Sequence, residues 1–373
     1  MGPLAGVKIV EFQGIGPAPM ASMMLADMGA TMIRIDRTSD AGLGVPIAEK
    51  FEFTKRSRSA IQLDLKSAEG VETALRLIEG ADALIEGFRP KVMERLGLGP
   101  EVCLARNPKL VYGRVTGWGQ EGPLALAAGH DLNYIALTGA LHAIGRKGQK
   151  PTPPLNLVGD YGGGSLYLIT GLLAGIISAR ATGKGQVVDA AMVDGALSLM
   201  TPIYAMKAGG RLPQPRGENQ LDSGAYFYEV YECSDGQFIS IASIEAKFHA
   251  ELLQRLGIDP ASMPSQWERG QWESVKDRLA ALFRTNTRDH WCSILEGTDV
   301  CFAPVLSMDE AHAHPHNAAR QAFIDVGGMR QPAPAPRFQG TPLATPVPPS
   351  EVDVAATLRA FGLSSAEVKA VTG

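Results

Sequence analysis

Cysteine is scarce in this sequence of 373 residues. Only four cysteines occur, they are widely spaced, and none belongs to a CxxC pair. This spacing excludes a disulfide-rich scaffold and the common zinc-binding motifs, and it favours reduced thiols in the cytoplasm. The four are Cys103, Cys233, Cys292 and Cys301.

Long hydrophobic runs and an excess of one charge are also lacking. The longest near-continuous apolar stretch, residues 166–178, is shorter than the ~18–20 residues that span a bilayer. The net charge of −4 gives no reason to expect nucleic acid or an anionic membrane as partner. We see no signal peptide before segment 7–11 and no lipidation or peroxisomal signal in residues 370–373. We therefore expect a cytoplasmic protein without a membrane span.

What the sequence does contain is an ordinary globular composition in which strand and helix patterns alternate. Hydrophobic residues make up 45% and charged residues 20%, which is enough for a sizeable core, and the length favours two domains. Strands that alternate with helices are typical of a parallel sheet with helices on its faces. The predicted strands are 7–11, 31–35, 83–86, 110–115 and 186–189, and the predicted helices are 18–28, 71–79 and 190–200.

The pattern changes in the second half of the chain. Two strand runs, 226–233 and 237–242, flank a turn, helices follow from about 247 and 275, and a proline-broken tail ends in a short helix at 365–371. We therefore predict an α/β protein whose Rossmann-like large domain carries a parallel sheet. The predicted parts are the large domain, 1–208, a crossing linker, 209–224, a smaller α+β domain, 225–305, and a return segment that packs on the large domain, 306–373.

Two patterns match cofactor sites only in part. The segment 14–16 (Gly-Ile-Gly) lies between a predicted strand and helix, as in a dinucleotide fingerprint, but Pro19 occupies the place of the third glycine. Three histidines alternate between 312 and 316, but no cysteine or carboxylate cluster completes a tetrahedral metal site. We therefore expect neither a nicotinamide or flavin cofactor nor a bound metal.

Basic residues gather where the predicted strands end. Ligands of parallel sheets bind beyond the carboxyl ends of the strands, and arginine side chains match phosphate groups. For each residue alone a solvated surface position is the alternative, but the set favours a phosphate-bearing ligand. Its members are Arg34, Arg37, Lys55, Arg56, Arg58, Arg89, Lys91 and Arg95.

Two polar segments are the strongest candidates for chemistry. Segment 129–134 (Gly-His-Asp-Leu-Asn-Tyr) precedes an apolar helix, and segment 156–164 carries Asp160 shortly before three consecutive glycines. Taken singly, His130 fits a structural histidine and Asp160 fits a helix N-cap. Glycines at a helix N-terminus would let a ligand approach backbone N–H groups that attract developing negative charge. Together the two segments favour a catalytic site.

Further segments carry a family resemblance: 4–11 (LAGVKIVE), 29–36, 63–66 (LDLK), 116–123 (TGWGQEGP) and 183–189 (GKGQVVD). On these segments the chain resembles, over essentially its whole length, the α-methylacyl-CoA racemases of the family III CoA transferase superfamily. His130 and Glu245 are similar to racemase positions, whereas the transferases typically lack the histidine. Asp160 discriminates less, because transferases carry a nucleophilic aspartate at that place.

The resemblance implies a racemase fold that forms an interlocked homodimer, with an acyl-CoA as substrate and no separate cofactor. Glu245 would meet His130 within one chain or across the dimer. The segment 40–50, which opens at Asp40, has no clear family pattern and leaves contacts to the nucleotide end open. The implied residues are His130, Asp160, Glu245 and Asn156 for catalysis; Arg37, Leu63, Lys66, Arg89 and Arg95 for CoA; the backbone of Tyr161, Gly162 and Gly163 for the oxyanion; and Met192, Met200, Met206 and Ile244 for the acyl surface.

Inversion of the α-carbon requires a base on one face and an acid on the other, and each proton transfer contributes roughly 10²–10⁴-fold. Our hypothesis places His130, oriented by Glu245, on one face and Asp160 on the other. Asp160 must hold a proton while His130 removes one. Burial raises the pKa of a carboxyl group and a helix N-terminus lowers it, and we expect burial to dominate.

Two alternatives stay open at this point. A CoA transferase would use Asp160 as the nucleophile that attacks a thioester, and His130 and Glu245 argue against it. A non-catalytic acyl-CoA-binding protein would keep the fold without the chemistry, and the intact polar set argues against that.

Overall fold

The computed structural model describes residues 2–39, 42 and 44–372. It divides into two compact units, of which the first comprises Met1–Thr138, Leu155–Met200 and Gln321–Gly373 and the second Gly139–Pro154 and Thr201–Arg320. The predicted segment 209–224 thus lies inside the second unit, and the predicted return segment 306–373 is divided at residue 320. Of the large domain predicted as 1–208, residues 139–154 and 201–208 also belong to the second unit.

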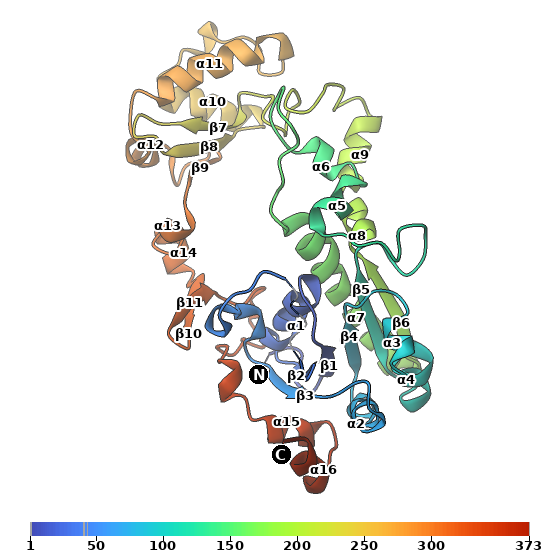
Figure 1. The fold of residues 1–373 in the computed structure, drawn as a ribbon. Coiled ribbons are helices and arrows are strands. Elements are labelled where there is room, and N and C mark those ends of the chain that lie inside the picture. The colour runs from blue at the N-terminus through green and yellow to red at the C-terminus, as the bar shows by residue number, and fades with distance from the viewer. Residues whose placement is uncertain (1, 40–41, 43, 373) are drawn as a thin grey trace. The chain divides into compact units, whose positions relative to one another are not determined.

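A six-stranded parallel sheet forms the centre of the first unit (Figure 1), in the order β3-β2-β1-β4-β5-β6. The order reverses between β1 and β4, and ligands of such sheets bind beyond the carboxyl ends of the strands at that point. The strands are β1 (Lys8–Phe12), β2 (Thr31–Asp36), β3 (Ser59–Gln62), β4 (Ala83–Glu86), β5 (Val111–Thr116) and β6 (Gln186–Ala191).

Helices cover both faces of this sheet. On one face α1 (Pro17–Asp27) and α7 (Leu166–Thr182) bury apolar side chains against β1, β4 and β5. On the other face α2 (Ala68–Glu79) and the C-terminal α15 (Val354–Ala360) pack on β1, β2 and β4. The remaining helical segments of the unit are η1 (Glu49–Phe51), η2 (Phe53–Lys55), α3 (Val92–Arg95), α4 (Pro100–Arg106), α5 (Asp131–Ala136), the π-helical η3 (Leu157–Ser165), α8 (Met192–Leu199), η6 (Pro349–Glu351) and α16 (Ser365–Thr372).

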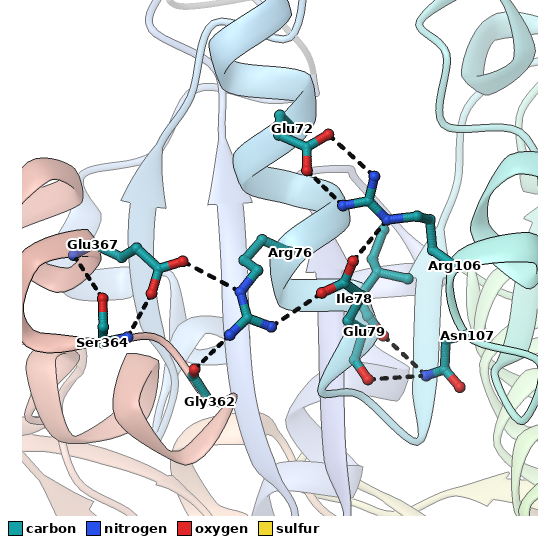
Figure 2. Close-up of polar contacts among 9 residues, drawn as sticks. All are labelled: Glu72, Arg76, Ile78, Glu79, Arg106, Asn107, Gly362, Ser364 and Glu367. Carbon is teal, nitrogen blue, oxygen red and sulfur yellow. Dashed lines mark hydrogen bonds and ion pairs between the residues drawn. The ribbon is translucent and has the colours of Figure 1, made fainter.

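Ion pairs on the surface fasten the C-terminal segment to α2 (Figure 2). The Arg76 guanidinium donates to the carbonyl of Gly362 at 2.8 Å and to Glu367 at 3.2 Å. On its other side Arg76 pairs with Glu79, which also accepts from Arg106 at 2.6 Å. A hairpin of β10 (Phe323–Val326) and β11 (Met329–Pro332) belongs to the same unit. The C-terminal residues are therefore part of the sheet-bearing unit.

A three-stranded antiparallel sheet, β7-β8-β9, organises the second unit. Its strands are β7 (Tyr228–Glu232), β8 (Phe238–Ala242) and β9 (Phe302–Val305). Buried aromatic and aliphatic side chains of α10, α11 and α12 pack against them and form a separate core. The helical segments are α6 (Ala140–Ala143), α9 (Thr201–Ala208), α10 (Ala246–Arg255), η4 (Pro260–Ser262), η5 (Arg269–Gln271), α11 (Trp272–Phe283), α12 (Arg288–Leu295), α13 (Met308–Ala311) and α14 (Pro315–Ala319).

The apolar helix differs from its predicted length. Residues 157–182, η3 followed by α7, form a 26-residue helical stretch that is long and apolar enough, by length and composition alone, to cross a membrane. Half of its most apolar window is buried inside the unit, and the core helices of soluble proteins meet the same criteria. The stretch is therefore weak evidence for a membrane span.

Candidate active site

His130 lies at the N-terminus of the short helix α5, and side chains of that helix fix the backbone on both sides of it. The His130 backbone N–H donates to Oδ1 of Asn133 at 3.1 Å. The Tyr134 hydroxyl donates to the carbonyl oxygen of Gly129. The His130 side chain itself is exposed. The Gly-His-Asp-Leu-Asn-Tyr segment thus presents an imidazole from a firmly held backbone.

Asp160 lies in the π-helical η3, and its backbone is held by α5. The N–H groups of Gly159 and Asp160 both donate to Oδ2 of Asp131, at 2.7 and 2.6 Å. The Asp131 side chain is buried, and its other oxygen, Oδ1, accepts no hydrogen bond among the described residues. π-helical turns occur frequently at functional sites. One helix therefore holds the segments of both predicted proton-transfer residues.

The Asp160 carboxyl group is half-buried between Asn156 and Gly16. Its Oδ2 accepts from Nδ2 of Asn156 at 3.3 Å, and a Cβ added to Gly16 would lie 3.1 Å from the same oxygen. Burial raises the pKa of Asp160, the Asn156 hydrogen bond lowers it, the charge of Asp131 raises it and His130 lowers it. The net pKa is raised, in agreement with the expectation that burial dominates.

The glycines after Asp160 serve packing, which corrects our expectation of open backbone. A Cβ on Gly163 would lie 2.7 Å from the backbone nitrogen of Ala196, and one on Gly164 would lie 2.9 Å from the Met192 and Pro17 side chains. These glycines let η3 pack closely against α8 and α1.

The predicted oxyanion donors are also engaged. The Tyr161 N–H donates to the carbonyl oxygen of Asn156 at 3.3 Å. Gly162 and Gly163 lie inside the π-helical η3, and in such a helix an N–H group bonds the carbonyl five residues earlier. The role of Tyr161, Gly162 and Gly163 as oxyanion donors stays a prediction, which these helical hydrogen bonds do not favour.

The carboxyl edge of the sheet brings several predicted CoA residues together. Arg37 follows β2, and its guanidinium lies 5.3 Å from the centre of the Phe88 ring, which follows β4. The Leu63 N–H donates to the carbonyl of Asp36 at 3.0 Å, so that Leu63 lies directly beside this edge. The pKa of the Tyr134 hydroxyl is raised to about 12, mainly by burial and also by the charge of Asp160, while Arg89 lowers it, so Arg89 acts electrostatically on α5.

Arg37, Lys66, Arg89 and Arg95 are exposed, and the described contacts do not place Lys66 or Arg95 beside Asp160. The residues Asp40, Ala41 and Leu43, at the start of the segment that we expected near the nucleotide end, lie outside the described residues.

Three arginines of the predicted basic set are internal, which corrects their assignment to a phosphate site. Arg58 is fully buried and pairs with Glu11. Arg56 pairs with Asp27 at 2.5 Å, and Arg34 pairs with Asp36 at 2.6 Å. Each of these arginines is thus neutralised by a carboxylate of the same unit, on β1, α1 or β2, and its charge is not free for a phosphate group.

A buried group that the sequence analysis missed supports the loop after β4. Glu86 accepts the Phe88 N–H at 2.7 Å and an Arg114 N–H at 2.8 Å, while Arg114 also pairs with Glu94 of α3 at 2.9 Å. Burial raises the pKa of Glu86 to about 7. This cluster fixes the loop that carries Arg89.

The acyl-surface residues do not form one group. Met192 is 6% exposed and belongs to the core of the first unit, and its role at an acyl surface stays a prediction. Met200, at the end of α8, is half-buried in the first unit. Met206, Ile244 and Glu245 belong to the second unit, where Glu245 is exposed at the N-terminus of α10.

Exposed leucines do cluster on the segments around Asp160. They lie on α5 and directly after it, on α8, on both sides of the start of η3 and at the start of α7. They are Leu132, Leu137, Leu155, Leu157, Leu166, Leu197 and Leu199.

Comparisons with known proteins show the family and the fold of the chain. The chain is 41% identical to the "Alpha-methylacyl-CoA racemase" of Mus musculus, covering 98% of this chain and 95% of that protein. It is 39% identical to the protein of the same name from Homo sapiens, covering 91% and 87%. Among solved structures, a CAIB/BAIF family protein from Brucella suis superposes with a TM-score of 0.79 at 25% identity, covering 92% of this chain and 94% of that one. The profile of the CoA-transferase family III matches residues 4–351. The chain belongs to the CoA-transferase family III.

Proposed function

We propose that this protein is an isomerase that racemises 2-methylacyl-CoA thioesters. The carrying observation is that one short helix, α5, presents His130 at its N-terminus and holds the backbone of half-buried Asp160 through Asp131. The two relatives that are about 40% identical over nearly the whole chain are named racemases, which supports this reaction over CoA transfer.

The reaction moves a proton off one face of the α-carbon and returns a proton to the other. In one direction neutral His130 removes the proton and protonated Asp160 delivers one; in the other direction Asp160 is the base and protonated His130 is the acid. In each direction, one of the two groups must be protonated and the other unprotonated. A raised pKa at Asp160 brings its proton affinity closer to that of an imidazole, which favours both directions near neutral pH.

The intermediate is an enolate whose charge lies on the thioester oxygen. Gly16, the residue before α1, lies against the Asp160 carboxyl group, so the positive end of an 11-residue helix dipole faces the reacting centre. We assign enolate stabilisation to this end of α1, in place of the engaged N–H groups of η3. The hydrogen bond from Asn156 would orient the Asp160 carboxyl group.

The CoA part of the substrate would bind at the carboxyl edge of the sheet. Arg37 and Arg89 would pair with phosphate oxygens, with Lys66 and Arg95 contributing charge and Leu63 an apolar contact. The chemistry needs no cofactor, because coenzyme A enters as part of the substrate.

The remaining residues of the site would come from a partner copy. An interlocked homodimer would bring Glu245, Ile244 and Met206 of one chain to His130 and Asp160 of the other, and it would cover the exposed leucines around η3. Unpaired cysteines fit a reducing compartment, so we place the enzyme in the cytoplasm.

Isotope exchange tests this function. A single enantiomer of 2-methyldecanoyl-CoA, incubated with the enzyme in deuterated water, should gain α-deuterium and lose optical purity with no acid acceptor present. CoA exchange that depends on an added carboxylic acid, without α-deuterium, would identify a transferase that uses Asp160 as nucleophile. Tight binding without either reaction would leave only an acyl-CoA-binding protein.

A further inference from the structure

The Asp131 side chain links α5 to the Asp160 segment by hydrogen bonds. It is the first residue of the helix and follows His130 directly. Its Oδ2 accepts the N–H groups of Gly159 and Asp160 at 2.7 and 2.6 Å, although these residues are 28 and 29 positions away in the sequence. The backbone of one proton-transfer residue is thereby tied to the residue that adjoins the other.

The close contact requires glycine at 159. A Cβ at that position would lie 2.6 Å from Oδ2 and 2.9 Å from Cγ of Asp131, far inside ordinary contact distance. Glycine therefore allows the Asp131 carboxylate to reach two successive N–H groups at the first turn of η3. The close approach of the Asp131 carboxylate therefore accounts for glycine at position 159.

Stability alone does not account for Asp131. The residue is 5% exposed, and its second oxygen is buried without a hydrogen-bond partner in the described part of the chain. An unsatisfied buried polar atom is destabilising, and such groups in native structures call for a reason other than stability. A backbone that must be held in one place beside reacting atoms is such a reason, since a displacement of ~1 Å in an active site can cost about 10²-fold in rate.

We propose that Asp131 is a positioning residue for the reaction. It holds Asp160 on the side of the α-carbon opposite His130, so that α5 positions both proton-transfer groups. The inference deepens the proposed function and rests on it. Asn133 and Tyr134, which hold the backbone at 129–130, complete the same support on the His130 side.

Asp131 also acts on Asp160 through its charge. The charges that bear on the pKa of Asp160 are those of Asp131, which raises it, and His130, which lowers it, after the larger effect of burial. Removing the Asp131 charge should therefore lower the pKa of Asp160. The acidic limb of the pH–rate profile, where the doubly protonated pair loses its first proton, should move to lower pH.

The test compares Asp131→Ala and Asp131→Asn in the full chain with wild type. We expect kcat for racemisation of 2-methyldecanoyl-CoA to fall about 10²-fold in Asp131→Ala, while KM changes little because the CoA phosphates bind elsewhere. Asp131→Asn keeps one acceptor oxygen and should recover about tenfold of that loss, with its acidic limb at lower pH than in wild type. Gly159→Ala, which pushes the carboxylate away without changing it, should resemble Asp131→Ala.

Asp353→Ala is the matched control. Asp353 also caps a helix by accepting a backbone N–H, that of Ala356 at 2.8 Å, but it lies at the start of α15. This substitution should lower the melting temperature by a few degrees and leave kcat unchanged.

The outcomes distinguish a failure of the proposed racemase function from a failure of the positioning role of Asp131. If wild type neither racemises nor exchanges the α-proton, the proposed function fails. If wild type is active and folded Asp131→Ala retains kcat within threefold, only the positioning role fails. If Asp131→Ala does not fold, Asp131→Asn decides, and an unchanged kcat together with an unchanged acidic limb overturns the inference.

Discussion

Two polar clusters of the sheet-bearing unit both consist of short hydrogen bonds to carboxylates, but one is exposed and the other is buried. Around α2, Arg106 bridges Glu72 and Glu79 and Arg76 reaches the C-terminal segment, in short contacts open to solvent (Figure 2). Around η3, Asp131 makes equally short contacts to Gly159 and Asp160, but it is 5% exposed, whereas the Glu72 side chain is 60% exposed. Bond length does not distinguish the two clusters, whereas burial does.

The difference in surroundings sets what each cluster contributes. Exposed ion pairs are worth about 0–1 kcal/mol, because water and salt screen them. Hydrogen bonds to a charged group are worth about 1.5–3 kcal/mol, and buried charges shift the pKa values of their neighbours. The α2 cluster therefore attaches the C-terminal segment to the unit, while the η3 cluster controls the position and the proton affinity of Asp160.

The largest effect in this comparison is expected from the proton-transfer residues themselves. His130→Ala and Asp160→Asn should each lower the rate of racemisation by about 10²–10⁴-fold, because each removes one proton transfer. Polarimetry of a single enantiomer measures the rate. Loss of CoA binding in either variant would point to a structural defect instead, so titration with CoA is the control.

The sequence predicted the sheet-bearing unit well because its strands are short apolar runs with clear stops. Strands at 8–12, 31–36, 83–86 and 111–116 follow the predicted ranges within about one residue at each end. β3, Ser59–Gln62, was missed because its four residues include polar ends and carry little pattern. Gly162–Gly164 looked like open backbone because sequence alone does not reveal that α8 and α1 pack against them.

The site was predicted less completely because its partners are distant in sequence. Asp131 was visible only as part of a motif, since its bonds to residues 159 and 160 depend on the π-helical turn. Arg56 and Arg58 were grouped with the predicted phosphate-binding residues because their partners, Asp27 and Glu11, lie 29 and 47 residues away in the sequence. Arg37, which follows β2 directly, is exposed at the carboxyl edge of the sheet, so its assignment to CoA stays a prediction.

A smaller effect on the rate is expected from a substitution of Gly16, which lies next to the Asp160 carboxyl group. Gly16→Ala places a Cβ 3.1 Å from Oδ2 of Asp160 and puts alanine at a φ of +66°. We expect kcat to fall about tenfold through displacement of the carboxyl group and stability to fall by about 1 kcal/mol. Gly6→Ala, at φ +86° with open space around its Cβ, is the matched control and should change stability alone.

Glu86 is another buried carboxyl group, and it should make the stability of the folded chain depend on pH. Burial raises its pKa in the folded chain to about 7 from an ordinary value of 4.5, so the folded chain holds an extra proton between those pH values. Stability from this group is therefore lost as pH rises from about 4.5 to 7, by about 1.4 kcal/mol for each pKa unit of difference. Glu86→Gln lacks this dependence, so its melting temperature relative to wild type should rise from pH 5 to pH 7. A constant difference would contradict the raised pKa.

The smallest effect is expected from the exposed cluster. Arg106→Ala removes the pairs with Glu72 and Glu79 and should lower the free energy of unfolding by less than about 1 kcal/mol, with kcat unchanged. Chemical denaturation at low and high salt measures the change, which should shrink in high salt. A salt-independent loss above 2 kcal/mol would mean that this cluster behaves as a buried one.

Stereospecific exchange in the two base variants tests the central claim most directly. Each enantiomer of 2-methyldecanoyl-CoA is incubated separately with His130→Ala and with Asp160→Asn in deuterated water, and α-deuterium is followed by mass spectrometry. If the two groups face one carbon from opposite sides, each variant retains exchange with one enantiomer only, and the two variants retain opposite enantiomers. Exchange of the same enantiomer by both variants, or of both enantiomers by either one, would contradict the account.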